Sequence, residues 1–493
     1  ASDYQAMGLP IVGAEGASLL GGVLSNKAES EVDTWPKLEP LASTVVRVTG
    51  TADGTPADPA LTASEINALG ITNAPVTADN LDAVVAAIAG QSGGSADVDA
   101  LSELDSVVNT AVGDFDTAHS AIKAYAGDGS IDAGATAPDQ AVYKDLGVAP
   151  ALAGNTQLLA SVNTVLASAP VEGNNASAPA DVSTAAKVKA LFSHYDAIRT
   201  ANGDGSLGLN QSQYEALGLG DPVDFGSNPT EKLALLNDVL DDRSGADTAN
   251  VDTWDKLSAL ASTVDELIAS AASGTKSTSL DESALVEAGF GGVTADNLDA
   301  VLQAIADSNP DDLQALSDSD IDDTNDLTSV VGTAVSDFDS ALTAVKNYAR
   351  DNSGTEPALS DYADLAVSVS APTGVSDADL VQGFATVLAG STVTESEVGT
   401  AADIQVLVDD YTALVDAAKT DTPASLDKNQ YAALGITQPD GTALSDEEAS
   451  LLNEVMAEQS ADPVPTLTDL QALADTVSQV MGSVTNSTPD SAL

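Results

Sequence analysis

Acidic loops are the part of this sequence with the clearest potential for chemistry, because clustered carboxylates with glycine nearby are ligands that Ca²⁺ prefers. The densest cluster contains Asp318, Asp320 and Asp322, but no glycine follows to form the turn of a calcium loop. Loops at 126–132 and 202–206 contain glycine, yet the second lacks a carboxylate at the last ligand position. We therefore predict no cofactor except a calcium ion at Asp318, Asp320 and Asp322. The alternative is a polar loop with diffuse ion condensation.

Catalytic groups are scarce in the sequence. The two histidines are His119 and His194, and His119 is replaced by Leu342 in a second copy of its segment. No serine stands in a Gly-x-Ser-x-Gly pattern, no phosphate-binding glycine loop is found, and there is no cysteine. We expect no enzyme.

The elements that must position any such site are set by an internal duplication. Trp35 and Trp254 stand in matching Val-Asp-Thr-Trp segments, and Tyr214 and Tyr431 stand in matching Gln-Tyr-x-Ala-Leu-Gly segments. Both pairs lie about 220 residues apart, and two further pairs of segments share that spacing. Repeats of this kind are typical of a stacked array that provides length and surface. Each tryptophan begins a long helical segment, so we expect it to pack against the neighbouring part of the array.

Each long repeat contains three copies of a smaller helical module. A long amphipathic segment, a loop, a short segment ending in glycine and a final amphipathic segment follow one another. In the fourth module, the apolar residues of 257–271 fall at steps of three and four, which places them on one helical face. A loop at 273–277 precedes a short helix at 285–289, whose glycine stands where a left-handed cap belongs. We expect Thr294 to cap the final helix.

Helix-start signals recur along the chain, whereas strand signals are nearly absent. The segments 62–65, 394–397 and 445–448 read as capping boxes, in which side chains satisfy free backbone amides at a helix start. Asn228-Pro229 and Asn309-Pro310 place a cap residue before a proline at the first helical position. Few alternating runs and few aromatic residues argue against strands. The predicted fold class is all-α.

The predicted architecture is a set of tandem small helical bundles stacked in an elongated array. Complete modules are expected at 31–95, 96–180, 181–248, 249–312, 313–398 and 399–466. The segments 1–30 and 467–493 read as half-modules, so that the sequence starts and stops inside a module. An apolar helix face is then left uncovered at each end.

Charge and composition restrict the function classes. The 493 residues contain 76 acidic against 16 basic side chains, a formal net charge of −60, with 43% hydrophobic and 3% aromatic residues. Such a surface repels nucleic acid and anionic lipid headgroups, and its self-repulsion makes stability depend on ionic strength. No stretch approaches the roughly 18 apolar residues of a membrane helix. We expect neither nucleic-acid binding nor membrane insertion, and the absence of cysteine fits an exported protein.

Several segments resemble repeats of giant secreted bacterial surface proteins, which are adhesin-like, cysteine-free and rich in Ala, Asp, Thr and Val. The segments are 33–41, 69–88, 252–260, 289–305 and 434–437. The resemblance implies an extracellular or cell-surface location and an extended, non-enzymatic role. It implies no particular site residue. The glycine- and aspartate-rich nonapeptide calcium repeats that often accompany such proteins are missing from this sequence.

Two functions follow as expectations. The first is a structural array, either the shaft of a giant adhesin within a longer chain or the subunit of a cell-surface filament that assembles head-to-tail with itself. The second is a helical binding module that recognises a host protein, matrix or divalent ions at the cell surface through repeated exposed faces. Binding predicts matching exposed residues in the two long repeats, whereas a spacer predicts matching core residues. Most matches are apolar or cap residues, but Asp79-Asn80 and Asp296-Asn297 are matched polar pairs without an assigned role.

Overall fold

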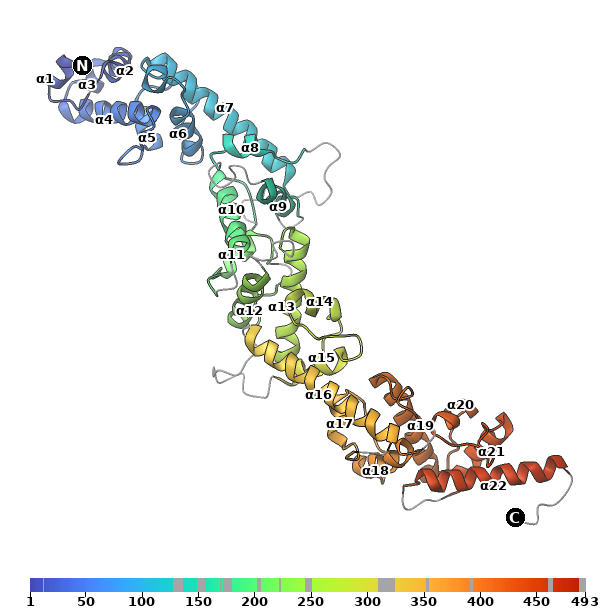
Figure 1. The fold of residues 1–493 in the computed structure, drawn as a ribbon. Coiled ribbons are helices and arrows are strands. Elements are labelled where there is room, and N and C mark those ends of the chain that lie inside the picture. The colour runs from blue at the N-terminus through green and yellow to red at the C-terminus, as the bar shows by residue number, and fades with distance from the viewer. Residues whose placement is uncertain are drawn as a thin grey trace. The chain divides into compact units, whose positions relative to one another are not determined.

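All regular elements in the described part of the chain are helical. The computed structural model describes residues 1–11, 13–126, 136–148, 156–168, 171, 180–201, 205–220, 223–243, 251–308, 324–351, 354–390, 393–459 and 464–486. Within these ranges there are 22 α-helices, one 3-10 helix and no strand (Figure 1). The prediction of an all-α fold is therefore confirmed. The chain divides into two compact units, Ala1–Asp265 and Glu266–Leu493, and the smaller modules remain predictions.

Three kinds of helix alternate along the chain (Figure 1). The long helices are α4 (Trp35–Ala52), α7 (Leu101–Tyr125), α10 (Ala185–Thr200), α13 (Trp254–Ser273), α16 (Thr324–Asp351), α19 (Ala401–Thr420) and α22 (Leu467–Asn486). The short helices are α1 (Ser2–Ala6), α5 (Ala63–Ala68), α8 (Gln140–Asp145), α11 (Gln211–Ala216), α14 (Glu282–Ala288), α17 (Leu359–Asp364) and α20 (Lys428–Ala433). The third kind comprises α2 (Ala14–Ser25), α6 (Leu81–Ala89), α9 (Thr156–Ala167), α12 (Pro229–Arg243), α15 (Leu298–Asp307), α18 (Asp377–Leu388) and α21 (Asp446–Ala457). Two further elements, α3 (Glu29–Val32) and η1 (Gly94–Asp97), precede the long helices α4 and α7 in the sequence.

Apolar periodicity explains why the long helices form. In α13 the residues at steps of three and four are buried, and Leu257, Val264 and Leu267 expose none of their surface. A helix with one apolar stripe gains most of its stability by burying that stripe against neighbours. The helical face expected for 257–271 is therefore confirmed.

Each short helix is followed closely by one residue in the left-handed region of backbone conformation. These residues are Gly8, Gly70, Gly147, Gly218, Gly289, Ala366 and Gly435, with φ between 54° and 110°. Glycine suits this position because it has no Cβ to clash with the backbone. At six of the seven, the next residue donates its N–H to a carbonyl five positions back, as Leu219 does to Tyr214 at 3.0 Å. This bond closes the short helix, and the cap expected at Gly289 is confirmed.

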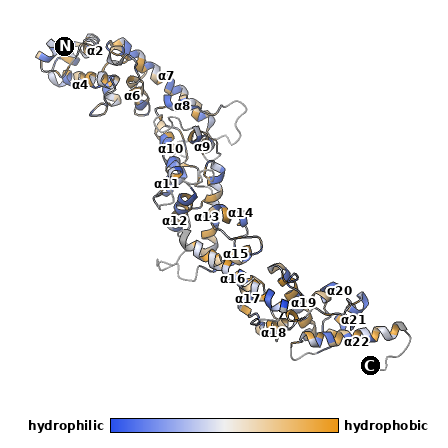
Figure 2. Ribbon diagram, in the orientation of Figure 1, coloured by the Kyte–Doolittle hydropathy of each residue, from blue (hydrophilic) through white to orange (hydrophobic). Residues whose placement is uncertain are grey.

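Buried apolar residues form a core within each of the two units. In the N-terminal unit, one core is largely aliphatic and includes Leu20, Val45 and Leu104. In the C-terminal unit, tyrosines join the core, and Tyr411 and Tyr431 are fully buried. Figure 2 shows that hydrophobic residues recur along the helices of both units rather than gathering in one place.

The helix starts differ from the sequence expectation at two places. Residues 395–398 form a turn, and α19 begins later, at a capping box between Thr400 and Asp403. The final helix of the fourth module begins at Leu298 with Asn297 as its cap residue, three positions after Thr294, although Thr294 Oγ1 accepts from Asn297 N at 3.4 Å as a cap would. In both cases several Ser, Thr, Asn and Asp residues compete for one cap, and sequence alone does not choose between them. The boxes at Thr62 and Ser445, and the start at Pro229, are confirmed.

Candidate functional site at the joints between helices

The residues predicted to bind calcium lie outside the described part of the chain. This applies to Asp318, Asp320 and Asp322, and to most of the loops at 126–132 and 202–206. Among the described residues, no group of three or more His, Asp or Glu side chains is placed to hold a metal ion. The calcium site therefore stays a prediction.

The two histidines contact structural groups. His119 is 7% exposed, its Nε2 lies 3.0 Å from the carbonyl oxygen of Val182, and its ring packs at a tilt on Phe115. His194 Nδ1 lies 3.3 Å from Nε2 of Gln213, a residue of the capping box that begins α11, and burial lowers the pKa of His194. His119 thus contacts a backbone carbonyl, and His194 contacts a capping side chain.

The two tryptophans lie at the ends of the preceding short helices. Trp254 donates its indole N–H to the carbonyl of Leu217 at 3.2 Å and its backbone N–H to Thr164 Oγ1 at 2.9 Å. Trp35 lies against Gly8, where an added Cβ would meet its ring at 3.6 Å, and it is 48% exposed. Both tryptophans therefore contact the end of a preceding short helix, although half of Trp35 remains accessible, and their packing between modules stays a prediction.

Four long helices begin with a backbone N–H that donates a hydrogen bond to a side chain 81 to 106 residues earlier. We call these four contacts the helix joints. They join Asp79 to Ala185, Asp296 to Ala401, Thr164 to Trp254 and Thr386 to Leu467. In each joint, a side-chain oxygen accepts from the backbone N–H of the first helical residue. The joints therefore tie the start of a helix to an element that is distant in sequence.

Two of the helix joints use a carboxylate at equivalent positions of the two long repeats. Asp79 Oδ1 accepts from Ala185 N at 2.7 Å, and Asp296 Oδ1 accepts from Ala401 N at 3.1 Å. The first amides of a helix lack intrahelical partners and lie at the positive end of the helix dipole. A carboxylate there stabilises the helix by about 0.5–2 kcal/mol. Asp79 and Asp296, the acidic members of the two matched polar pairs, therefore each accept a hydrogen bond from the start of a distant helix.

The asparagine half of each pair holds the loop that presents the carboxylate. Asn80 and Asn297 are 4% and 3% exposed. Asn80 Oδ1 accepts from Thr77 N at 2.7 Å, and Asn297 Oδ1 accepts from Thr294 N at the same distance. Buried amides are stable only when hydrogen-bonded, so these contacts fix the loop geometry.

The other two helix joints use a threonine hydroxyl. Thr164 in α9 and Thr386 in α18 accept from Trp254 N and Leu467 N, both at 2.9 Å. The sequence analysis did not single out these threonines. The available signal was that both stand in matching Thr-Val-Leu-Ala segments, one in each long repeat.

A second recurring contact, the turn contact, joins a left-handed turn to the next long helix. Its donor is the second residue after the left-handed residue, and its acceptor is the fifth residue of the following long helix. The three cases are Thr72 N to Asp105 Oδ1 at 2.9 Å, Ser368 N to Gln405 Oε1 at 2.6 Å and Thr437 N to Gln471 Oε1 at 3.1 Å. Turn contacts thus connect successive groups of helices.

The chemistry available at these positions is the satisfaction of backbone amides by carboxylate, hydroxyl and amide oxygens. No protein-family model, curated protein or solved structure matches the chain. The function of the chain must therefore be inferred from the helix joints and the turn contacts.

Some of the 16 basic residues lie beside these contacts. Lys189, the fifth residue of α10, forms an ion pair with Asp82 of α6, next to the Asp79 joint. Lys232 is 3% exposed, and its Nζ lies 2.6 Å from Asp265 and also donates to the carbonyl of Asp224. A buried cation needs such partners, because leaving it unpaired costs several kcal/mol. The scarce lysines thus help to connect helices.

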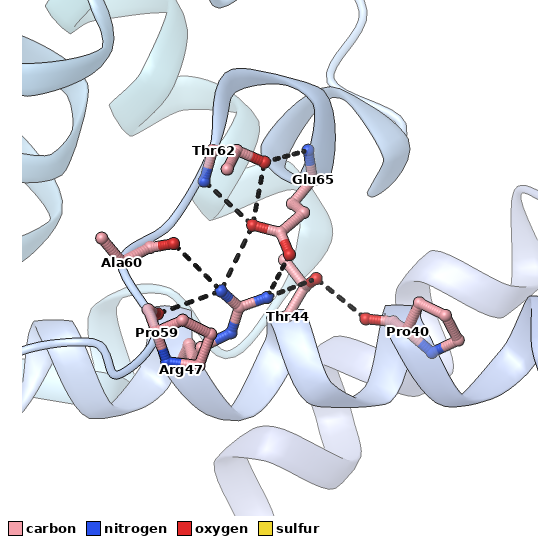
Figure 3. A network of polar contacts seen from close by, with 7 residues as sticks. All are labelled: Pro40, Thr44, Arg47, Pro59, Ala60, Thr62 and Glu65. Carbon is pink, nitrogen blue, oxygen red and sulfur yellow. Dashed lines mark hydrogen bonds and ion pairs between the residues drawn. The ribbon is translucent and has the colours of Figure 1, made fainter.

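A polar network fastens α5 to α4 in the N-terminal unit (Figure 3). Arg47 Nη2 lies 2.5 Å from Glu65 Oε1, and Arg47 Nη1 donates to the carbonyls of Pro59 and Ala60. Thr62 and Glu65 form the capping box that begins α5. The hydrogen bond from Arg47, helped by those from Thr62, lowers the pKa of Glu65 from 4.5 to about 2. The short helix therefore depends on a charged pair for its position.

The C-terminal unit also contains a cavity of about 500 Å³. Its lining includes Asp379, Gln382 and Lys419. Asp379 already accepts a hydrogen bond from Ser376 at the start of α18. Among the described helices, none combines the length and apolar composition needed to span a lipid bilayer.

Proposed function

We propose that this chain is a non-enzymatic structural protein of the cell exterior. Its tandem helical bundles would stack into an elongated array that serves as the shaft of a giant adhesin or as the subunit of a surface filament. The observation that carries this proposal is the location of the matched polar residues. Asp79, Asn80, Asp296 and Asn297 are buried or half-buried at helix joints rather than exposed.

Matched residues distinguish a spacer from a binding module. A module that binds the same partner twice keeps the same exposed side chains in both copies, because those side chains supply the repeated affinity. A spacer keeps the residues that join one helix group to the next. The two long repeats share carboxylates, threonines and capping asparagines at joints, which supports the spacer.

The pattern of contacts supports an array. Helix joints span 81 to 106 residues, and turn contacts span 33 to 37 residues, so each group of helices is fastened to its neighbours along the chain. Contacts restricted to sequence neighbours are typical of repeat proteins whose modules stack in one dimension. The absence of cysteine, the net charge of −60 and the resemblance to secreted surface repeats support an exterior location.

Electron microscopy of the purified chain tests the proposed shape. In low salt, we expect narrow particles of constant width that are much longer than a globule of the same mass. Compact round particles would contradict the array.

Substitution of the joint carboxylates tests the role of the matched residues. In Asp79→Ala combined with Asp296→Ala, we expect stability to fall by about 1 kcal/mol at each joint. Hydrogen exchange at the first turns of α10 and α19 should become faster in the same variant. Asp116→Ala, at an exposed position of α7, is the matched control and should change neither quantity. Equal exchange rates in the joint variant and the control would show that the joints do not stabilise these helix starts.

A further inference from the structure

The first short helix presents apolar surface that the equivalent helices bury. Met7 is 55% exposed and Tyr4 is half-buried. Met7 directly follows α1, and the residues that directly follow α11 and α20, Leu217 and Leu434, expose none of their surface. The tyrosines equivalent to Tyr4 in α11 and α20 are fully buried as well. Exposure at α1 is therefore a property of its surroundings and not of its sequence.

Unlike α1, the short helices α11 and α20 each pack on a long helix that precedes them in the sequence. In the C-terminal unit α19 packs on α20 and α21, and in the N-terminal unit α10 packs on α11. Helix α2 does pack on α4, as α21 packs on α22. Among the described residues, no helix covers Tyr4 and Met7 in the way that α19 covers α20.

The last long helix presents the complementary surface. Val484 of α22 is 72% exposed, and Met481 is half-buried. The residues at the same steps from the start of α19 are Val415 and Ala418, and neither exposes any surface. Figure 2 shows hydrophobic segments recurring along α22 to its end. Helix α22 thus exposes apolar side chains at positions that are buried in α19.

Helix α22 also shares a polar feature with α19. Both have glutamine as their fifth residue, and both glutamines make the turn contact, Gln405 with Ser368 and Gln471 with Thr437. The starts of the two helices are therefore held alike, whereas in the described part of the chain only α19 is followed by a short helix that packs on it. This likeness argues that α22 can accept the partner that α19 has.

We propose that α22 of one copy of this chain docks on the face of α1 formed by Tyr4 and Met7 in a second copy. The docked helix takes the place over α1 that α19 takes over α20, so that two half-modules complete one module. This inference rests on the proposed structural role. It specifies a second copy of the chain as the partner and the α1 face as the docking surface. Because different faces meet, the contact is heterologous and propagates into a filament.

Charge sets the conditions for this docking. The groove beside Met481 is lined by Asp446, Glu447 and Glu454, and α1 brings Asp3 to the contact. Acidic side chains on both faces repel one another, and salt shortens the range of that repulsion to roughly 10 Å at 0.1 M. Assembly should therefore increase with ionic strength.

Complementation between two blocked variants tests the proposal. Met7→Asp blocks the α1 face and Val484→Asp blocks the α22 face, and both residues are exposed, so neither change disturbs the fold of its own chain. By sedimentation velocity in high salt, we expect the unchanged chain to form oligomers that grow with concentration. Each variant alone should stay monomeric, because a charge placed in an apolar contact weakens association by at least about tenfold. A mixture of the two should form dimers and nothing larger.

Val406→Asp, at a 56% exposed valine of α19, should assemble like the unchanged chain. A monomeric unchanged chain at its highest soluble concentration overturns the docking, and so does assembly that survives either blocking substitution. Dimers of one variant alone overturn it too, because they require like faces to meet. If the monomers are nevertheless narrow and elongated by electron microscopy, the docking fails while the structural role stands.

Discussion

At the scale of single residues, Ala366 occupies a conformation that glycine holds in the other six short-helix caps. Its φ is 54°, in a region where the Cβ of an L-residue crowds the backbone at a cost of roughly 1–2 kcal/mol. Part of that cost is offset because alanine has less freedom than glycine in the unfolded chain. The cap bond from Val367 N to Tyr362 O, 2.8 Å long, is nevertheless formed.

We therefore predict that Ala366→Gly raises the free energy of unfolding by about 0.5–1 kcal/mol. Urea unfolding followed by circular dichroism, with hydrogen exchange at Val367, measures the change. Gly435→Ala is the reverse substitution at the equivalent cap and should lower stability by about 1 kcal/mol. A destabilising Ala366→Gly would mean that the left-handed conformation is not strained in this chain.

A second residue-scale difference separates two equivalent tyrosines. The hydroxyl of Tyr143 donates to Asn163 Oδ1 at 2.6 Å, whereas the buried hydroxyl of Tyr362 has no partner among the described residues. Ala385 stands in α18 where Asn163 stands in α9, so the acceptor has been lost. Burial raises the pKa of both phenols, which keeps them neutral.

Phenylalanine substitutions should therefore have opposite effects at these two positions. Tyr143→Phe leaves Asn163 without its donor and should cost about 1–2 kcal/mol, whereas Tyr362→Phe removes an unpaired hydroxyl and should be neutral or slightly stabilising. Thermal unfolding of the two variants compares them directly. Equal losses in both would indicate that the Tyr362 hydroxyl is satisfied.

At the scale of helices, the Arg47–Glu65 pair makes the position of α5 depend on pH. The pKa of Glu65 is lowered to about 2 in the folded chain from 4.5 in the absence of the pair. The folded chain therefore binds the proton less readily than the unfolded chain. The pair contributes its stability above about pH 4.5 and loses it as the pH falls towards 2.

We predict that Glu65→Gln destabilises the N-terminal unit by about 1 kcal/mol at neutral pH. The difference from the unchanged chain should shrink between pH 4.5 and 2. Tryptophan fluorescence reports this unit, because Trp35 and Trp254 are its two tryptophans. Glu29→Gln, at an exposed position of α3 in the same unit, should show no such difference. A difference that stays constant down to pH 2 would exclude the carboxylate as its source.

Sequence predicted the helices better than the contacts between them. Apolar spacing, capping boxes and cap glycines act over a few residues, and so the helix at 254–273 and the cap at Gly289 were predictable. The helix joints bring together residues up to 106 positions apart, and no local pattern names the partner of Asp79. Asp79 was singled out only because its segment is repeated in the second long repeat. Thr386 also stands in a repeated segment, but it was not singled out because threonine is common in this chain.

At the scale of the whole chain, the net charge of −60 opposes every compact arrangement. Most acidic residues have no basic partner available, because they outnumber the basic ones by 76 to 16. Repulsion of this kind acts over the Debye length and weakens as salt is added.

We predict that the midpoint of thermal unfolding rises by about 5 °C between low and moderate NaCl, equivalent to roughly 2 kcal/mol for units of this size. Calcium chloride at matched ionic strength separates screening from specific binding. A larger rise with calcium, lost in a variant with Asn at Asp318, Asp320 and Asp322, would support the predicted calcium site. A midpoint independent of salt would contradict the repulsion argument.

The recurrence of the Asp79 joint at Asp296 has a genetic consequence. Unequal crossing-over between the two copies of the coding sequence would remove or add one whole repeat, as between the codons for Tyr214 and Tyr431. The recombinant chain would keep each carboxylate about 105 residues ahead of the amide that it caps. Lineages could therefore change the length of this chain by whole repeats, without evolving new contacts.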